Sequence, residues 1–157
     1  MDVTNAFPNA DLNEDIYMTS APGYSLQDNK VIKLNKALYG LKQSPNAWNN
    51  LINSFILSIG FVQSNDDCCI YMKSYSNSDM LYIGLYVDDI IICGNSIDSI
   101  TKLKNIIANR YKCKDLGPIR KYLGMQVYRD RLNRTITLSM QSYIDDMLKQ
   151  YCMTDCK

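Results

Sequence analysis

Two adjacent carboxylates between two apolar stretches constrain this chain more than any other feature. The run from Leu81 to Cys93 holds Asp88 and Asp89 between segments rich in β-branched and aromatic residues. Such segments form strands against a core, and Asp suits a tight two-residue connection. The pattern predicts strands at Met80 to Val87 and Ile90 to Cys93, with both acids at the tip of a hairpin. A solvated turn without further function is the alternative interpretation.

A third acid, Asp2, lies near the start of the chain. Like charges held close together raise each other's pKa unless a cation lies between them, and divalent cations such as Mg²⁺ prefer oxygen ligands. In two-metal phosphoryl-transfer sites, carboxylates hold two ions about 3.5–4 Å apart. One acid from a first strand and a pair from a hairpin fit that need. Taken alone, Asp2 would be interpreted as an exposed acid at a terminus.

Five ordered blocks of the sequence resemble the reverse transcriptase of copia-type LTR retrotransposons. In chain order they are MDVTNAF, KALYGLKQSPNAW, LYVDDIIICG, KDLGPIRKYLGMQV and LSMQSYI. The resemblance covers nearly the whole chain and implies an α+β polymerase palm, an antiparallel sheet with helices packed on one face, with partial fingers and the start of a thumb. It also implies RNA-directed DNA polymerase activity by two-metal nucleotidyl transfer with two Mg²⁺ ions, or Mn²⁺ in their place.

The resemblance assigns roles to the residues of the first and third blocks. It makes Asp2, Asp88 and Asp89 the catalytic, metal-binding triad and the Val3 carbonyl a backbone ligand. Phe7 falls where the family places an aromatic ring beside the sugar of the incoming nucleotide, and a ring there would exclude a ribose 2′-hydroxyl. An ordinary core aromatic is the alternative for Phe7.

The second block implies a nucleotide-binding segment beneath the nascent base pair. Its residues are Tyr39, Gly40 and Gln43. Glycine allows a close backbone approach or a conformation closed to other residues. Ser44 followed by Pro45 is typical of a helix cap and a first-turn proline. A loop entering a helix is the plainer interpretation, and both can hold together.

The fourth block supplies a lysine and a hairpin. Of Lys112 and Lys114 we choose Lys114 as the residue that assists the leaving pyrophosphate, although lysines are usually solvated surface charges. The residues that resemble a primer-binding hairpin are Tyr122, Leu123, Gly124 and Met125. Apolar groups around a glycine can position a primer terminus. A buried strand with one glycine bulge is the alternative.

Charge is segregated along the chain. Residues 1–100 carry five basic and eleven acidic side chains, a net charge of −6, whereas residues 101–134 carry ten and two, a net charge of +8. Clustered cations suit a phosphate backbone and need no sequence readout. A solvated helix face with a charged hairpin turn is the alternative. The ten basic residues are Lys102, Lys104, Arg110, Lys112, Lys114, Arg120, Lys121, Arg129, Arg131 and Arg134.

Composition predicts a single intracellular domain. The 157 residues are 46% hydrophobic, enough for one core, and no apolar run approaches the about 20 residues that cross a bilayer. Six cysteines without a C-x-x-C pair predict reduced, mostly structural thiols, because a zinc site would need four of them. The absence of histidine excludes Ser-His and Cys-His nucleophile pairs.

Periodicity predicts the remaining elements. A helix should follow Pro45 and end at Gly60, and a second should follow Ser96. We expect one more helix, with a capping box formed by Ser142 and Asp145. Strands are expected at residues 69–73, 122–129 and 135–138, and a loose surface segment at residues 19–30.

The resemblance also sets expectations about context. Family members carry fingers upstream of the first aspartate, so we expect a fragment of a Pol polyprotein that also serves DNA integration. Residues 1–134 would be the palm, and residues 135–157 the start of the thumb or connection. Expected partners are an RNA or DNA template, a DNA primer, deoxynucleoside triphosphates and the remainder of Pol, with no membrane. We expect a cytoplasmic, virus-like-particle location, with the nucleus as the alternative.

Two other interpretations remain open. The first is a catalytically inactive transposon remnant that keeps the palm fold and at most binds nucleic acid. The second is an RNA-directed RNA polymerase or a cyclase-type palm, which Phe7 and the five blocks oppose.

Overall fold

Alternating burial along the strands beside the acidic pair gives a sheet with one covered face. The computed structural model describes residues 1–20, 23–25, 30–76 and 79–155. Within strand β6 (Asp79–Tyr86), the side chains of Leu81, Ile83 and Leu85 are buried. Tyr82 and Tyr86, which alternate with them, are 42% and 54% exposed. Since successive strand side chains point to opposite faces, only one face of β6 contributes to the core.

The chain divides into two compact units, Met1–Asp115 and Leu116–Lys157, where a single domain was expected. The elements of the first unit are β1 (Asp2–Val3), the 3-10 helix η1 (Phe7–Asn9), β2 (Asp11–Met18), β3 (Ile32–Lys36), α1 (Ser44–Ser58), β4 (Val62–Gln63), β5 (Ile70–Ser76), β6, β7 (Asp89–Gly94), α2 (Ile97–Arg110) and β8 (Cys113–Lys114). Those of the second are β9 (Lys121–Tyr122), β10 (Met125–Asp130), β11 (Thr135–Ser139) and α3 (Gln141–Gln150).

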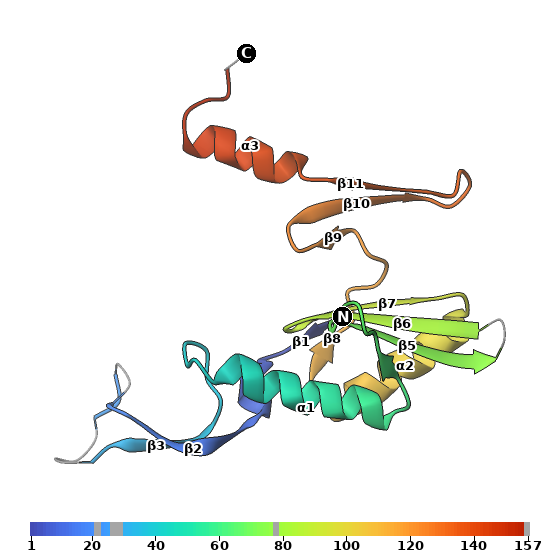
Figure 1. Ribbon diagram of the computed structural model, residues 1–157. Helices are drawn as coiled ribbons and strands as arrows, with labels where there is room; N and C mark the ends of the chain where they lie inside the picture. Colours follow the sequence, from blue (N-terminus) through green and yellow to red (C-terminus); the bar gives the residue numbers. More distant parts are fainter. Residues whose placement is uncertain (21–22, 26–29, 77–78, 156–157) are drawn as a thin grey trace. The chain divides into compact units, whose positions relative to one another are not determined.

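The main sheet of the first unit contains six strands in the order β4-β5-β6-β7-β1-β8. All its neighbouring pairs are antiparallel. Strands β5 to β7 follow one another in sequence, whereas β1 comes from the start of the chain and is inserted between β7 and β8 (Figure 1). The sheet therefore brings the first residues beside the acidic hairpin.

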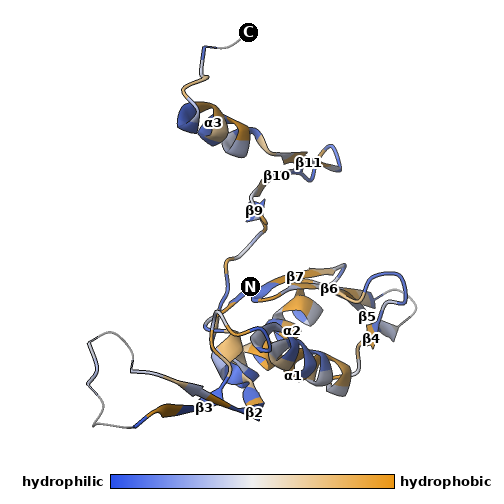
Figure 2. Ribbon diagram, turned by 60° about the vertical axis from the view of Figure 1, so that its left-hand side comes forward, coloured by the Kyte–Doolittle hydropathy of each residue, from blue (hydrophilic) through white to orange (hydrophobic). Residues whose placement is uncertain are grey.

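Helices α1 and α2 lie on the same side of this sheet (Figure 1). Trp48, Ile52 and Ile56 of α1 and Leu103 and Ile107 of α2 are each at most 2% exposed and join the inward side chains of the sheet in one core. Figure 2 shows that β6 and β7 consist largely of hydrophobic residues. The predicted mixed α and β class, with antiparallel strands and helices packed on one face of a sheet, is confirmed for this unit.

The two ends of α1 agree only in part with the capping residues predicted from the sequence. Gly60 has a φ of +88° and its N–H donates to the Leu57 carbonyl, so the predicted glycine stop is confirmed. The predicted Ser44 cap is wrong. Gln43 occupies the cap position, and the buried Ser44 hydroxyl donates to the Leu38 carbonyl at 2.5 Å instead. The Leu38 carbonyl, six residues earlier, has taken the place of the local capping bond.

The other two helices differ in how they begin. Helix α2 follows Ser96, as expected, and Ser96 caps it by accepting a hydrogen bond from the Ser99 N–H. The predicted capping box at Ser142 is wrong, because α3 begins two residues earlier than a cap at Ser142 requires and has Met140 at its cap position. The Gln141 side chain donates to Asp145 at 2.8 Å and occupies the carboxylate expected to close the box.

Two hairpins depart from the predicted strands. The expected single strand at residues 122–129 is two strands, β9 and β10, joined by a turn at Leu123 and Gly124. Strands β2 and β3 were not predicted; they pair antiparallel, and the Lys33–Asp15 and Lys36–Asp11 ion pairs cross between them. Residues 21–22 and 26–29 of the expected loose segment lie outside the described residues.

The second unit carries a three-stranded sheet in the order β11-β10-β9, followed by α3. None of its described residues, 116–155, is fully buried. Across the described ranges of the whole chain, no helix is long and apolar enough to span a membrane.

Close packing at the end of β7 gives the first prediction. A Cβ atom added to Gly94 would clash with the Leu81 Cδ2 atom and lie 3.1 Å from the Met80 carbonyl oxygen. Gly94→Ala should therefore lower the free energy of unfolding, measured by urea denaturation, by about 1–3 kcal/mol. Gly84→Ala is the matched control, since the new methyl group would meet only ordinary contacts at 3.7 Å or more. Equal effects of the two substitutions would contradict this account of the packing.

Candidate functional site

The two-residue strand β1 brings Asp2 to the acidic hairpin. Asp2 is the register partner of Asp89 on one side and of Lys114 on the other. Backbone hydrogen bonds fix the alignment: the Val3 N–H donates to the Asp88 carbonyl and the Ile90 N–H to the Met1 carbonyl, both at 2.8 Å. Asp2 and Asp89 are therefore neighbours in the sheet although 86 residues lie between them in the sequence.

The side chains of Asp2, Asp89 and Lys114 face away from the core. Val3 and Ile90, which alternate with Asp2 and Asp89, are 1% and 3% exposed. Residues directly opposite one another in antiparallel strands share a face. Tyr86, the register partner of Asp89 on β6, extends the row. The uncovered face of the sheet thus carries a row across four strands. It consists of the Tyr86 ring, the Asp89 and Asp2 carboxylates and the Lys114 ammonium group.

The turn that carries Asp88 differs from the predicted one. Because Tyr86 pairs with Asp89, the two turn residues are Val87 and Asp88, and Asp89 already belongs to β7. The prediction that Asp88 and Asp89 together form the turn is therefore wrong by one residue. Val87 has a φ of +53°. This left-handed conformation costs a non-glycine residue roughly 1–2 kcal/mol, so local preference argued against a turn there.

Electrostatics sets Asp89 apart among the acids of the site. Burial raises the pKa of Asp89 above its usual range, and the negative charges of Asp88 and then Asp2 raise it further, while the Met1 ammonium acts in the opposite direction. In the described part of the chain, no group donates a hydrogen bond to any of the three carboxylates or forms an ion pair with them. Their oxygen atoms are thus available to a cation, and Mg²⁺ suits such ligands.

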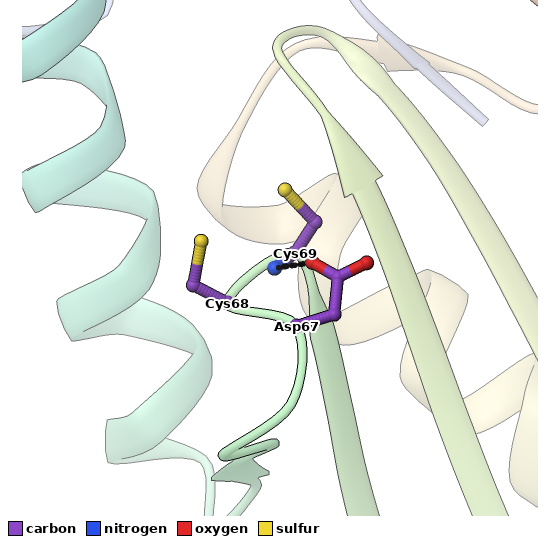
Figure 3. Close-up of side chains that lie close together, drawn as sticks. All are labelled: Asp67, Cys68 and Cys69. Carbon is purple, nitrogen blue, oxygen red and sulfur yellow. Dashed lines mark hydrogen bonds between the residues drawn. The ribbon is translucent and has the colours of Figure 1, made fainter.

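The three carboxylates are neighbours without forming a closed cage. Among described residues, the one set of three ligand atoms lying within 4.8 Å of one another is Asp67, Cys68 and Cys69 (Figure 3). This set is exposed, and its Asp67 carboxylate accepts a hydrogen bond from the Cys69 N–H at 2.8 Å. A local turn of the Asx type therefore accounts for the grouping.

The aromatic residues predicted at the nucleotide lie together. The rings of Phe7 and Tyr39 are 4.5 Å apart between centroids and tilted by 52°. Phe7 is half-buried in η1, and Tyr39 is 55% exposed in the loop before α1. Gly40 has a φ of +98°, which gives the predicted conformational reason for glycine at that position. Gln43 is half-buried at the start of α1.

The two candidate lysines are not equivalent. Lys114 lies on β8 directly opposite Asp2, whereas Lys112 precedes the strand. Lys104, another of the ten basic residues, forms an ion pair with Asp115 at 3.0 Å. Of these three lysines, Lys114 is the one that the sheet register aligns with the acids.

The residues predicted to bind the primer form a hairpin in the second unit. Met125 pairs with Tyr122, and the turn residues Leu123 and Gly124 both have positive φ, +48° and +83°. Of the two interpretations of this segment, the buried strand with a bulge is wrong: Leu123 is 44% exposed at the tip of a turn.

Tyr86 was not among the predicted site residues. Its position in the row beside Asp89 follows from the register of β6 and β7. The sequence held a signal, because Tyr82 and Tyr86 alternate with buried aliphatic residues and must face the side opposite the core.

Comparison with known proteins identifies relatives over the full chain. The family model described as "Reverse transcriptase (RNA-dependent DNA polymerase)" matches residues 1–157. The retrovirus-related Pol polyprotein from transposon TNT 1-94 of Nicotiana tabacum is 39% identical over 100% of this chain, and that from transposon RE1 of Arabidopsis thaliana is 36% identical over 100%. A putative transposon Ty5-1 protein of Saccharomyces cerevisiae is 37% identical over 92% of the chain.

The chain spans a minor part of these relatives. It covers 12% of the tobacco polyprotein, 11% of the Arabidopsis polyprotein and 47% of the yeast protein. No solved structure matches the chain.

Repulsion between the acids gives the second prediction. Asp89→Asn removes a charge that faces Asp2 directly, so without divalent cations at neutral pH it should raise the free energy of unfolding by roughly 0.2–1 kcal/mol. The raised pKa of Asp89 means that the folded state holds its proton more tightly than the unfolded state. The contribution of Asp89 to stability therefore falls as pH rises from the ordinary pKa of an aspartate to the raised pKa in the folded chain, and the advantage of the asparagine variant appears over the same interval.

Thermal unfolding in a chelating buffer, at pH values from about 4 to 7, measures this difference. Asp66→Asn is the control, because Asp66 is an exposed acid outside the row. A lower stability of Asp89→Asn at neutral pH would show that the three charges do not repel one another.

Proposed function

The chain belongs to the reverse transcriptase (RNA-dependent DNA polymerase) family, and we propose that it carries the polymerase palm of a copia-type retrotransposon Pol polyprotein. The proposed reaction is RNA- or DNA-templated addition of deoxynucleotides to a DNA primer. The observation that carries the proposal is the sheet row in which Asp2 lies opposite both Asp89 and Lys114, with Asp88 in the adjoining turn. In this account residues 1–134 are palm and residues 135–157 begin the thumb or connection.

Asp2, Asp88 and Asp89, with the Val3 carbonyl, would hold two Mg²⁺ ions, with Mn²⁺ as the substitute. Support comes from the shared sheet face of Asp2 and Asp89, the burial and the neighbouring negative charges that raise the pKa of Asp89, and the lack of hydrogen-bond donors to the three acids in the described residues. Bound metal would supply acidity to the primer 3′-hydroxyl and neutralise charge on the pyrophosphate. Two ions rather than one suit carboxylates that are spread over a hairpin and a neighbouring strand.

Lys114 would act on the leaving group. Its alignment with Asp2 places its ammonium group on the same face as the acids. A positive charge there stabilises the negative charge that develops on the departing pyrophosphate, and it needs no covalent intermediate.

Phe7 and Tyr39 would form the floor of the nucleotide site, with Gly40 and Gln43 beside them. The contact between the two rings restrains both side chains, so a sugar packed on Phe7 would meet a rigid surface. A rigid surface can exclude a 2′-hydroxyl by contact alone, which favours deoxynucleotides.

The hairpin of Tyr122, Leu123, Gly124 and Met125 would hold the primer terminus. Its exposed, tightly turned tip suits contact with sugars. Template recognition through the phosphate backbone would draw on the basic residues of the segment 101–134, since an RNA–DNA hybrid offers shape and charge more than readable base edges. The remainder of the Pol polyprotein is the proposed protein partner, and a cytoplasmic virus-like particle is the proposed location, with the nucleus as the alternative.

A primer-extension assay tests the reaction. With Mg²⁺, a primed RNA template and deoxynucleotides, the chain should extend the primer, and Asp2→Asn or Asp88→Asn should each lower the rate by more than about a hundredfold through loss of metal-dependent charge stabilisation. Asp66→Asn should retain the rate of the unsubstituted chain.

The same assay separates the alternatives when it is repeated on a chain extended upstream into the polyprotein. Extension by the longer form alone supports a palm that needs its fingers. Failure of both forms, with folding intact, favours the inactive remnant.

Sugar selection gives a separate prediction. Phe7→Ala should admit ribonucleotides and reduce the preference for deoxynucleotides at least about tenfold, because the steric block is removed. Phe7→Tyr keeps a ring of similar size and should retain the preference. The measurement is the ratio of kcat/KM for a deoxynucleotide to that for the matching ribonucleotide, and an unchanged ratio in Phe7→Ala would reject this role.

A further inference from the structure

A hydrogen bond from a buried indole group restrains the turn that carries Asp88. The Trp48 Nε1–H donates a hydrogen bond to the Val87 carbonyl oxygen at 2.6 Å, across 39 residues of sequence. Trp48 comes from α1 and is 2% exposed. The contact thus joins the buried face of the core helix to the tip of the acidic hairpin.

Val87 needs such a restraint. Its φ of +53° lies in the left-handed region, where the first residue of a two-residue hairpin loop is normally glycine, asparagine or aspartate. Among the non-glycine residues with positive φ in the described ranges, Val87 is the β-branched one. β-Branched side chains tolerate this region least, so another conformation of the turn would be favoured if nothing opposed it.

The restraint acts on the backbone around Asp88. Its preceding peptide carbonyl, that of Val87, accepts from Trp48, and its own carbonyl accepts from the Val3 N–H at 2.8 Å. Both peptide planes that flank the Asp88 Cα atom are therefore fixed, and with them the direction of the Cα–Cβ bond from which the carboxylate extends. Loss of the indole donor would free one of these planes.

The indole itself is firmly seated. Its ring packs edge-on against Tyr111 with centroids 5.3 Å apart, and Phe55 packs in the same way on Tyr111. A donor fixed by an aromatic cluster can hold a strained turn, whereas a mobile side chain would follow the turn as it relaxed.

We propose that Trp48 is a positioning residue of the polymerase site, which holds the Val87–Asp88 turn in its left-handed conformation through the indole N–H. This proposal rests on the function proposed above, although the contact itself does not depend on it. Trp48 touches no reacting group; it acts through the geometry of Asp88.

The functional test removes the donor and keeps an aromatic ring. Trp48→Phe should lower kcat for primer extension about tenfold or more, because a displaced catalytic group is costly, while KM for the nucleotide stays within about twofold, since Phe7 and Tyr39 are untouched. Phe55→Leu is the matched control: it trims the same aromatic cluster without touching the turn, so it should lower thermal stability and leave kcat unchanged. Loss of kcat in both variants to the same degree, or in neither, would overturn the proposal.

Rescue gives the decisive comparison. Glycine adopts positive φ at no steric cost, so Val87→Gly should restore most of kcat in the Trp48→Phe background and change little in the unsubstituted chain. A purely structural role of Trp48 predicts no rescue, and its absence in a folded double variant would reject the proposal.

A readout without catalysis separates this proposal from the polymerase assignment. Trp48 is the only tryptophan of the sequence, so its indole resonance is unambiguous in NMR spectra. A scalar coupling across the hydrogen bond between Trp48 Nε1 and the Val87 carbonyl carbon is expected in the 157-residue chain. Its absence would overturn the proposal whether or not the chain polymerises, whereas its presence in an inactive chain would leave the positioning contact standing and place the failure on the proposed function.

Discussion

The pairing of β1 with β7 and β8 is the constraint on which the site depends. This strand has two residues, one of which, Val3, is buried in the core while the other, Asp2, faces outward. So short a strand cannot hold its place by its own hydrogen bonds. It is stabilised because it pairs with the longer strand β7 on one side and because Val3 packs in the core of the first unit. The acidic row is therefore a product of the whole first unit.

Sequence reasoning succeeded where a single physical pattern determined the outcome. Helices α1 and α2 follow from apolar residues at helical spacing, and Trp48, Ile52 and Leu103 are buried as that spacing requires. The strands beside the acidic pair follow from alternation, and the family resemblance is confirmed over the full chain. Within the candidate site, the acids of distant segments do meet on one sheet face. That meeting was expected from the motifs and could not be obtained from periodicity, since β1 is too short to show a period.

Sequence reasoning failed where a tertiary contact overrode a local preference. Val87 was assigned to a strand because β-branched residues favour strands, yet it lies in the turn, with its carbonyl bonded to the Trp48 N–H. Ser44 was expected to cap a helix, and a buried carbonyl took its hydroxyl instead. Strand β2 was not predicted because its acidic residues mask the alternation of polar and apolar positions. Lysines of β3 form ion pairs with these acids, and only the fold brings the two strands side by side. For Val87 and for β2 the deciding partner lies far off in the sequence, whereas for Ser44 it is a carbonyl six residues earlier.

The uneven distribution of buried side chains has a consequence for how this chain tolerates change. Within the described residues, the fully buried ones lie between Val3 and Tyr111, and none is found in the range 116–155. A substitution in the later segment has little packing to lose, so its thermodynamic penalty should be small, typically within about 0.5 kcal/mol. Substitutions there are therefore limited mainly by the contacts that the exposed surface must make. Substitutions in the earlier segment are limited first by the need of the chain to fold.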